Sequence, residues 1–148
     1  FSTASAWGVG YEVGKLKRAH EVVIVDTPPK ADSDLRPALR EADLALVPIA
    51  ASALDLWATE AVLDLVDRAG RPALTVLNRA RPGTRVHAET LAEMRALPAP
   101  VADAALNNRV IYAEAMGHGL GVTEVARTGP AGAEIAALAD EVATILAR

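Results

Sequence analysis

Three short apolar runs, each followed by a segment of helical character, constrain the fold of this chain more than any other feature. They cover residues 21–26, 44–49 and 73–78. The first is a continuous β-branched run, which is typical of a strand buried on both faces in a parallel sheet covered by helices. We therefore predict an α/β fold: a mostly parallel sheet flanked by helices, with right-handed crossovers between its strands.

Helices are expected between and after these strands. Ser33 or Asp34 can cap the first of them, and Ser52 with Asp55 three residues later indicates a capped start for another. Residues 10–16 are expected to form a helix that leads into the first strand, with Val13 and Leu16 facing the sheet. The remaining expectations are helices over 34–40, 52–70, 83–96, 109–116 and 130–146, an extended piece at 100–102 and a glycine-rich loop at 117–121.

Composition limits the class of protein. The 148 residues are 51% hydrophobic and 23% charged, which predicts one packed domain with one core over residues 1–148. A net charge of −4 argues against a strongly basic nucleic-acid binder, although a local basic patch is compatible with it. The absence of cysteine excludes disulfides, thiolate zinc sites and cysteine nucleophiles. No apolar run approaches the roughly 20 residues of a membrane span, so a cytoplasmic protein without a membrane partner is expected.

Candidate chemistry lies at the ends of the predicted strands, because ligands of open parallel sheets bind beyond the carboxyl ends of the strands. Asp26 ends an apolar strand, as the Walker B acid does when it orients Mg²⁺ through water beside nucleotide phosphates. The alternative is that Asp26 only caps the following turn, although the stiff Pro28-Pro29 pair favours a loop with a defined position. Asn78 could bond a base edge, but its own turn is slightly favoured.

Other reactive patterns are weak. The segment 10–16 is one residue short of a P-loop between its glycines and has Leu16 in place of the hydroxyl residue, so the phosphate cradle is absent. The three histidines have no metal-ligand spacing. Trp7 and Trp57 are interpreted as packing or interface residues.

Arginines gather after the third predicted strand, at Arg79, Arg81 and Arg85. Such a cluster could contact DNA phosphates without sequence preference. With Glu89 and Glu93 close by, it could also be an ordinary solvated surface.

The motifs together resemble the ParA branch of the ParA/MinD ATPases. They are VIVDTPP at 23–29, ADLALVP at 42–48, DLWAT at 55–59, VLNR at 76–79 and NRVIYAEAM at 108–116, and the resemblance runs from about Glu21 to the C-terminus. It implies a P-loop NTPase-like fold that binds ATP with Mg²⁺ and forms a homodimer with nucleotide at the interface. It also implies slow ATP hydrolysis stimulated by a ParB-like or other partner protein, and non-specific DNA binding that positions a plasmid, a chromosome or another cargo, with association with the nucleoid.

The resemblance also assigns residues. Asp26 matches the Walker B acid that acts in catalysis and holds Mg²⁺ through water, and Thr27, Pro28 and Pro29 match the switch loop after it. Asn78 matches the polar residue beside the adenine, with Arg79 next to it. Arg109 falls in the region of the family's DNA-contacting basic residues. Arg85, which comes from the arginine cluster and not from the resemblance, is the second arginine expected at DNA.

The family's deviant P-loop, with its signature lysine, would lie N-terminal to all of these motifs. We therefore expect the chain to be the C-terminal portion of such an ATPase, truncated at its N-terminus and unable to hydrolyse ATP by itself. One alternative is a non-catalytic dimerisation or regulatory scaffold derived from the same fold. Another is a receiver-like α/β domain, but the acidic cluster and late lysine of that chemistry do not occur.

Overall fold

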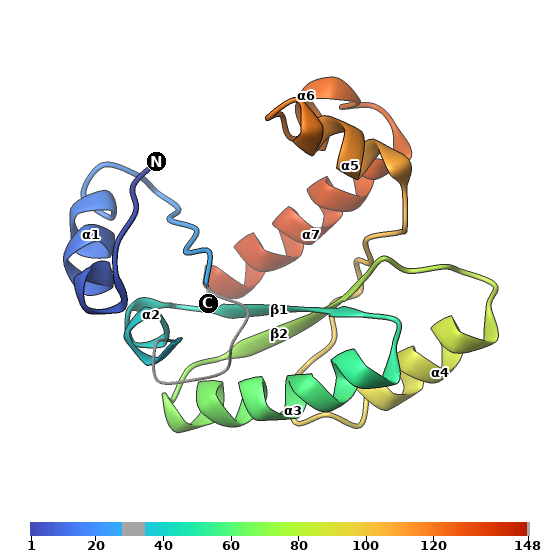
Figure 1. Ribbon diagram of the computed structural model, residues 1–148, viewed down its shortest axis with the longest axis horizontal. Helices are drawn as coiled ribbons and strands as arrows, with labels where there is room; N and C mark the ends of the chain where they lie inside the picture. The colour runs from blue at the N-terminus through green and yellow to red at the C-terminus, as the bar shows by residue number, and fades with distance from the viewer. Residues whose placement is uncertain (28–34, 148) are drawn as a thin grey trace.

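The computed structural model describes residues 1–27 and 35–147, which form helices packed around a small parallel sheet (Figure 1). Strand β1 (Ala45–Ala50) pairs in parallel with β2 (Ala73–Asn78), in a register that places Ala45 beside Ala73 and Ala50 beside Asn78. The strands predicted over residues 44–49 and 73–78 are confirmed within one residue. Helix α3 (Ala53–Arg68) makes the crossover between them, as the alternation of strand and helix predicted.

An extended segment continues the sheet beyond β2. Val101 bridges Thr75, and Asn107 bridges Ala80, both in parallel. Backbone N–H groups of Ala102 and Leu106 donate to the carbonyls of Thr75 and Leu77 at 2.8 and 2.9 Å. The predicted extended piece at 100–102 is therefore confirmed, and its pairing continues past the end of β2 to Ala80, as far as residue 108.

Helices cover the two faces of β2. On one face, Leu77 packs in a core cluster with Leu56 and Leu63 of α3 and with Met94 of α4 (Arg85–Met94). On the other face, Leu74 and Val76 pack against Leu138 of α7 (Pro130–Leu146). All of β2 from Leu74 to Leu77 is buried as a result, which is the burial expected of a strand between two helical layers.

Strand β1 is buried on one face only. Its alternate residues Val47 and Ile49 lie in the core cluster beneath α3, whereas Leu46 and Pro48 are exposed on the other face. The expectation of a strand covered on both faces is therefore wrong for β1, because none of the described helices packs over Leu46 and Pro48.

Capping residues define the helix starts. Ser52 Oγ accepts the backbone N–H of Asp55 at 3.1 Å and donates to its carboxylate at 2.6 Å, so the predicted cap of α3 is confirmed. Thr84 caps α4 by accepting the N–H of His87 at 3.2 Å. Helices α2 (Leu35–Glu41), α5 (Val110–Gly117) and α7 match their predicted ranges closely, and the four-residue α6 (Val122–Val125) was not predicted.

The predicted strand over residues 21–26 is wrong. These residues follow α1 (Val9–Leu16) as an irregular segment, drawn as a coil in Figure 1, and Ile24 is 91% exposed. A β-branched run forms a strand only where a neighbour completes its hydrogen bonds, and among the described residues β1 pairs with β2 alone. Helix α1 packs against α2 rather than against the sheet, so only the burial of Val13, and not the sheet contact, is as predicted.

Two isoleucine truncations test this correction. We expect Ile49→Ala, at a side chain with no exposed surface, to lower the free energy of unfolding by about 2–5 kcal/mol because it leaves a core cavity. The matched change Ile24→Ala should alter it by less than about 0.5 kcal/mol. Urea unfolding followed by circular dichroism measures both free energies. If Ile24→Ala lowers the free energy of unfolding as much as Ile49→Ala does, residues 21–26 are buried and the correction is wrong.

Candidate functional site at the carboxyl edge of the sheet

The residues that follow β2 form a strained and highly polar turn. Arg79 has a φ of +50°, and it is the one non-glycine residue with positive φ among those described. The side-chain Oδ1 of Asn78 accepts the Arg79 N–H at 2.9 Å, which fixes this turn. Of the two interpretations of Asn78, its bond to its own turn is therefore observed, and its Nδ2 group is left for another partner.

The 107–109 segment lies against this turn. The backbone N–H of Asn108 donates to the carbonyl of Ala80 at 2.8 Å. With its Oδ1 facing Arg81, the Asn108 side chain accepts from Arg81 Nε and Nη2 at 3.2 and 3.0 Å. Hydrogen bonds thus join the turn after β2 to the 107–109 segment at the carboxyl edge of the sheet, where ligands of this fold class bind.

A carboxylate of α7 anchors this segment from behind. Glu134 accepts from Asn107 through the backbone N–H at 3.1 Å and through Nδ2 at 2.7 Å. Arg109 donates to Glu134 Oε1 from Nε at 2.8 Å and from Nη2 at 2.7 Å, and Tyr112 Oη donates to Oε2 at 2.9 Å. The Glu134 side chain is only 12% exposed. We call Glu134, Asn107, Arg109 and Tyr112 the Glu134 cluster.

The charges of the Glu134 cluster are strongly perturbed. Burial raises the pKa of Glu134, but hydrogen bonds from Arg109, Asn107 and Tyr112 outweigh this effect and lower the pKa to about 2. Burial and the hydrogen bond to Glu134 raise the pKa of Tyr112 to about 12. The hydrogen bond to Glu134 also raises the pKa of Arg109. The carboxylate is therefore ionised, and Tyr112 protonated, throughout the physiological range.

The other predicted site residues are scattered. Asp26 and Thr27 are exposed in the irregular segment, so Asp26 does not end a buried strand, and Pro28 and Pro29 lie outside the described residues. Arg85 Nε pairs with Glu89 Oε1 at 3.1 Å on the α4 surface, and Arg109 is bound by Glu134. Trp57 and Trp7 are 74% and 95% exposed, which contradicts a packing role and leaves the interface interpretation.

The residues of the site were compared with what a nucleotide with Mg²⁺ requires. The amide oxygens of Asn78 and Asn108 are already hydrogen-bonded, so the Nδ2 groups are what these two side chains can offer to a ligand. For the phosphates, Gly10 and Gly14 lie within helix α1 and form no phosphate loop. Among residues 1–27 and 35–147, no three or more His, Asp or Glu side chains group together as metal ligands would. The described residues therefore do not fit Mg²⁺ or the phosphates, and no hydrolytic step is derived from them.

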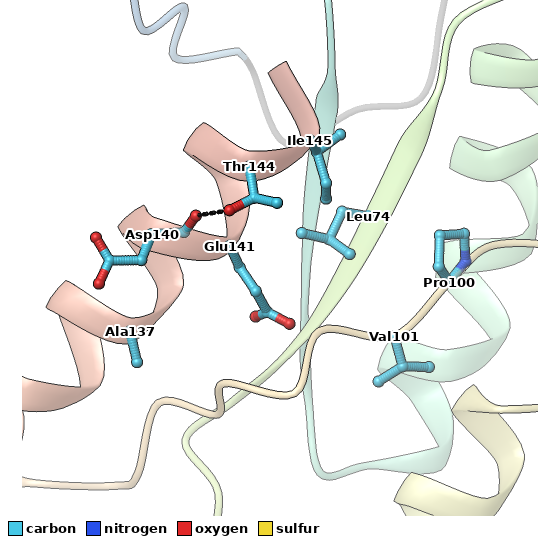
Figure 2. Close-up of a pocket in the computed structure, with 8 residues that line it drawn as sticks. All are labelled: Leu74, Pro100, Val101, Ala137, Asp140, Glu141, Thr144 and Ile145. Carbon is cyan, nitrogen blue, oxygen red and sulfur yellow. Dashed lines mark hydrogen bonds between the residues drawn. The ribbon is translucent and has the colours of Figure 1, made fainter. Parts of the chain in front are cut away.

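Two hollows on the surface of the described residues lie away from this edge. One, of about 460 Å³, is lined by Thr123, Arg127, Gly132 and Ala136. The second, of about 450 Å³, lies between α7 and the segment carrying Pro100 and Val101 (Figure 2). In Figure 2, Glu141 points from α7 toward that segment and Asp140 points away from it. Two carboxylates in its lining make the second hollow unsuited to phosphate.

Glu134, Asn107 and Tyr112 were not among the residues that the sequence pattern predicted for the site. The available signal was the spacing of Glu134 and Glu141, seven residues apart on a mostly apolar helix, which places both on one face of α7. Two acids on the sheet-facing side of a helix need donors, but the identity of those donors depends on tertiary structure.

The close approach of Gly132 to the preceding turn sets the start of α7. A Cβ at Gly132 would lie 2.5 Å from the carbonyl oxygen of Arg127. We expect Gly132→Ala to destabilise the chain by at least about 1–3 kcal/mol through this backbone clash. The control Gly14→Ala meets nothing within 4 Å and should stabilise helix α1 by about 0.5–1 kcal/mol. Thermal unfolding compares the two, and equal effects would contradict the close contact.

The pH dependence of stability tests the Glu134 cluster. Since the pKa of Glu134 is lower in the folded chain (about 2) than its ordinary value of 4.5, its contribution is complete above about pH 5 and is lost as pH falls toward 2. Glu134→Gln should therefore lower the free energy of unfolding by about 1–3 kcal/mol at pH 7. The difference from the wild-type chain should shrink as pH falls. A difference that does not change between pH 7 and pH 2.5 would contradict the depressed pKa.

The chain is similar in sequence to a curated protein and in fold to a solved structure. No family model matches the chain. A curated relative, the maintenance of carboxysome distribution protein A of Halothiobacillus neapolitanus, is 29% identical over 121 residues, which are 78% of this chain and 56% of that protein. Among solved structures, the cell division ATPase MinD of Pyrococcus furiosus superposes with a TM-score of 0.82 at 19% identity. That match covers 96% of this chain and 60% of MinD, so the chain spans little more than half the length of either protein.

The MinD likeness establishes the α/β fold with parallel strands and flanking helices that the sequence predicted. None of the described helices is long and apolar enough to cross a membrane. The chain is therefore similar in sequence to a carboxysome distribution protein and shares the fold of MinD, and both matches agree with the ParA/MinD resemblance of its sequence motifs.

Proposed function

We propose that this chain is the nucleotide-responsive body of a ParA-like positioning ATPase. Support comes from its similarity to a carboxysome distribution protein and from the fold it shares with a cell division ATPase. In this proposal, ATP with Mg²⁺ drives self-association into a homodimer, and the dimer places a cargo in the cytoplasm along the nucleoid. A ParB-like partner protein stimulates hydrolysis.

The observation that carries the proposal is the pair of asparagines at the carboxyl edge of the sheet. Asn78 and Asn108 come from adjacent loops that are held together by the Arg81–Asn108 and Asn108–Ala80 hydrogen bonds. Asn78 uses Oδ1 in its own turn, so its Nδ2 remains to donate to an acceptor of the base. Arg79, which is exposed beside it, completes the base side of the proposed site.

The proposal also assigns roles to residues 26–29. Asp26 is the acid that holds Mg²⁺ through water and acts in catalysis, with Thr27, Pro28 and Pro29 as its switch loop. Bringing Asp26 to the carboxyl edge requires residues 21–26 to pair as a strand, which they do not do in this structure.

DNA contact is proposed through Arg85 and Arg109. Both are already paired with carboxylates, Glu89 and Glu134, so DNA phosphates would have to compete for them.

A nucleotide titration tests the proposal. In ¹H–¹⁵N spectra of the chain, Mg·ATP should shift the resonances of Asn78, Arg79 and residues 107–109, and Mg·GTP should shift them less. Asn78→Ala should remove the response, whereas the control Thr144→Ala should retain it because Thr144 bonds only the Asp140 carbonyl. The chain alone should show no ATP turnover.

The outcomes separate the proposal from its alternative. No response of the carboxyl edge to any nucleotide would contradict the ATPase proposal and favour a non-catalytic dimerisation or regulatory scaffold. The exposed Leu54 and Trp57 on α3 are the observation that favours this second candidate. A scaffold predicts nucleotide-independent dimers by analytical ultracentrifugation, which the positioning ATPase does not.

A further inference from the structure

Two exposed tryptophans lie on helix faces that the proposed nucleotide site does not use. Trp7 precedes α1 and Trp57 lies on α3. Each has a second large exposed side chain about one turn away: Tyr11 is 74% exposed and Leu54 is 71% exposed. Large apolar side chains that gather in the open on one helix face are typical of surfaces that bind another protein.

Helix α1 is held in place by its inner face. Val13 is buried there, and α1 packs against α2. Just after α1, Lys17 Nζ donates to the carbonyl of Glu41 and to the carboxylate of Asp43, both at 3.1 Å. An eight-residue helix would not be stable alone, so these contacts fix it and present its outer face in one orientation.

The outer face of α1 has an aromatic half and a cationic half. Trp7, Tyr11, Lys15 and Arg18 follow one another at helical spacing and are exposed, and we call these four residues the α1 face. Lys15 lies 3.7 Å from Glu12, and its side chain is still 61% exposed. Arg18 forms no ion pair with any carboxylate of the described residues. The cationic half is therefore accessible to a partner.

The outer face of α3 has the same division, with acids in place of cations. Leu54 and Trp57 are exposed in its first two turns. Glu60 and Asp64 are exposed one and two turns beyond Trp57, and neither pairs with a cation of the described residues. We call Leu54, Trp57, Glu60 and Asp64 the α3 face.

The two faces complement each other when the helices lie parallel. Each face extends over about three turns. In the parallel arrangement the aromatic half of the α1 face meets the apolar half of the α3 face, and the cationic half meets the acidic half. An antiparallel arrangement would place the cations over apolar side chains instead. The next two charges of α3, Asp67 and Arg68, cancel and do not change this match.

The two faces of one chain do not meet each other. Helix α1 packs against α2, whereas α3 packs against β1 and α4. In Figure 1, α1 lies at the left of the molecule and α3 runs beneath the sheet. A second copy of the chain carries the complementary face and can supply it.

We propose that the α1 face of one copy binds the α3 face of a second copy, with the two helices parallel. Because the two faces belong to different helices, each copy keeps one face free, and this head-to-tail contact can extend beyond two copies. The contact uses neither Asn78 nor residues 107–109. It is therefore separate from the nucleotide-driven homodimer of the proposed function and from the closed dimer of a scaffold.

Two charge-reversal variants test this contact. The cation-reversed variant is Lys15→Glu with Arg18→Glu, and the acid-reversed variant is Glu60→Lys with Asp64→Lys. In sedimentation velocity without nucleotide, the wild-type chain should form a concentration-dependent series of oligomers in about 50 mM salt. The series should shorten in about 500 mM salt, because salt screens exposed charges. Each variant alone should associate at least about tenfold more weakly, because like charges then face each other.

A mixture of the two variants distinguishes loss of the contact from loss of folding. The acidic α1 face of the first variant matches the basic α3 face of the second, and the reverse pairing matches as well. An equimolar mixture should therefore recover the association that neither variant shows alone, which misfolded chains could not do. The matched control Arg95→Glu changes an exposed charge outside both faces and should associate like wild type.

The apolar half is tested by truncation. Trp57→Ala should weaken association at least about tenfold, because a large side chain at the centre of the contact is lost. The control Met116→Ala removes a side chain that is 76% exposed on α5 and should have no effect.

Four results separate the explanations. A wild-type chain that remains monomeric at every concentration overturns the contact, and so does a mixture that fails to recover association. A single dimer that is unaffected by the charge reversals also overturns it and favours the scaffold. If the mixture recovers association but the carboxyl edge does not respond to nucleotide, the contact stands and the proposed function fails.

Discussion

The carboxylate of Glu134 is the interaction on which the carboxyl edge of this fold depends. It accepts hydrogen bonds from a backbone amide, an asparagine, an arginine and a tyrosine, and its side chain is only 12% exposed. A buried carboxylate without these partners would be costly, and with them it stays ionised and rigid. Because Arg109 and Asn107 flank Asn108, the same carboxylate also fixes the position at which the 100–108 segment contacts the turn after β2.

The sequence predicted the elements whose signals are local. The run 73–78 is long and apolar enough to identify β2, Ser52 identifies the start of α3, and Pro130 marks the start of α7. The run 21–26 carries an equally strong β-branched signal and still forms no strand, because a strand requires a neighbour that its own residues cannot specify. Glu134 was missed for the same reason, since its partners lie 22 to 27 positions away along the chain.

The structure therefore separates the two sides of the proposed nucleotide site. The residues proposed for the base side, Asn78, Arg79 and Asn108, lie on a sheet whose topology is fixed by β1, β2 and the 100–108 segment. The phosphate side has no loop among the described residues, and Asp26 is exposed in an irregular segment. The uncovered face of β1, at Leu46 and Pro48, is a further sign that this part of the sheet is less completely packed than the edge held by α7.

The pKa of Glu134, measured in the folded chain by following its carboxyl ¹³C resonance through an acid titration, tests this account most directly. A pKa of about 2 is expected, because donors from three side chains and a backbone amide stabilise the ionised form against the cost of burial. A value near the ordinary 4.5 would mean that Arg109 and Tyr112 do not bind the carboxylate, and that Glu134 does not organise the carboxyl edge.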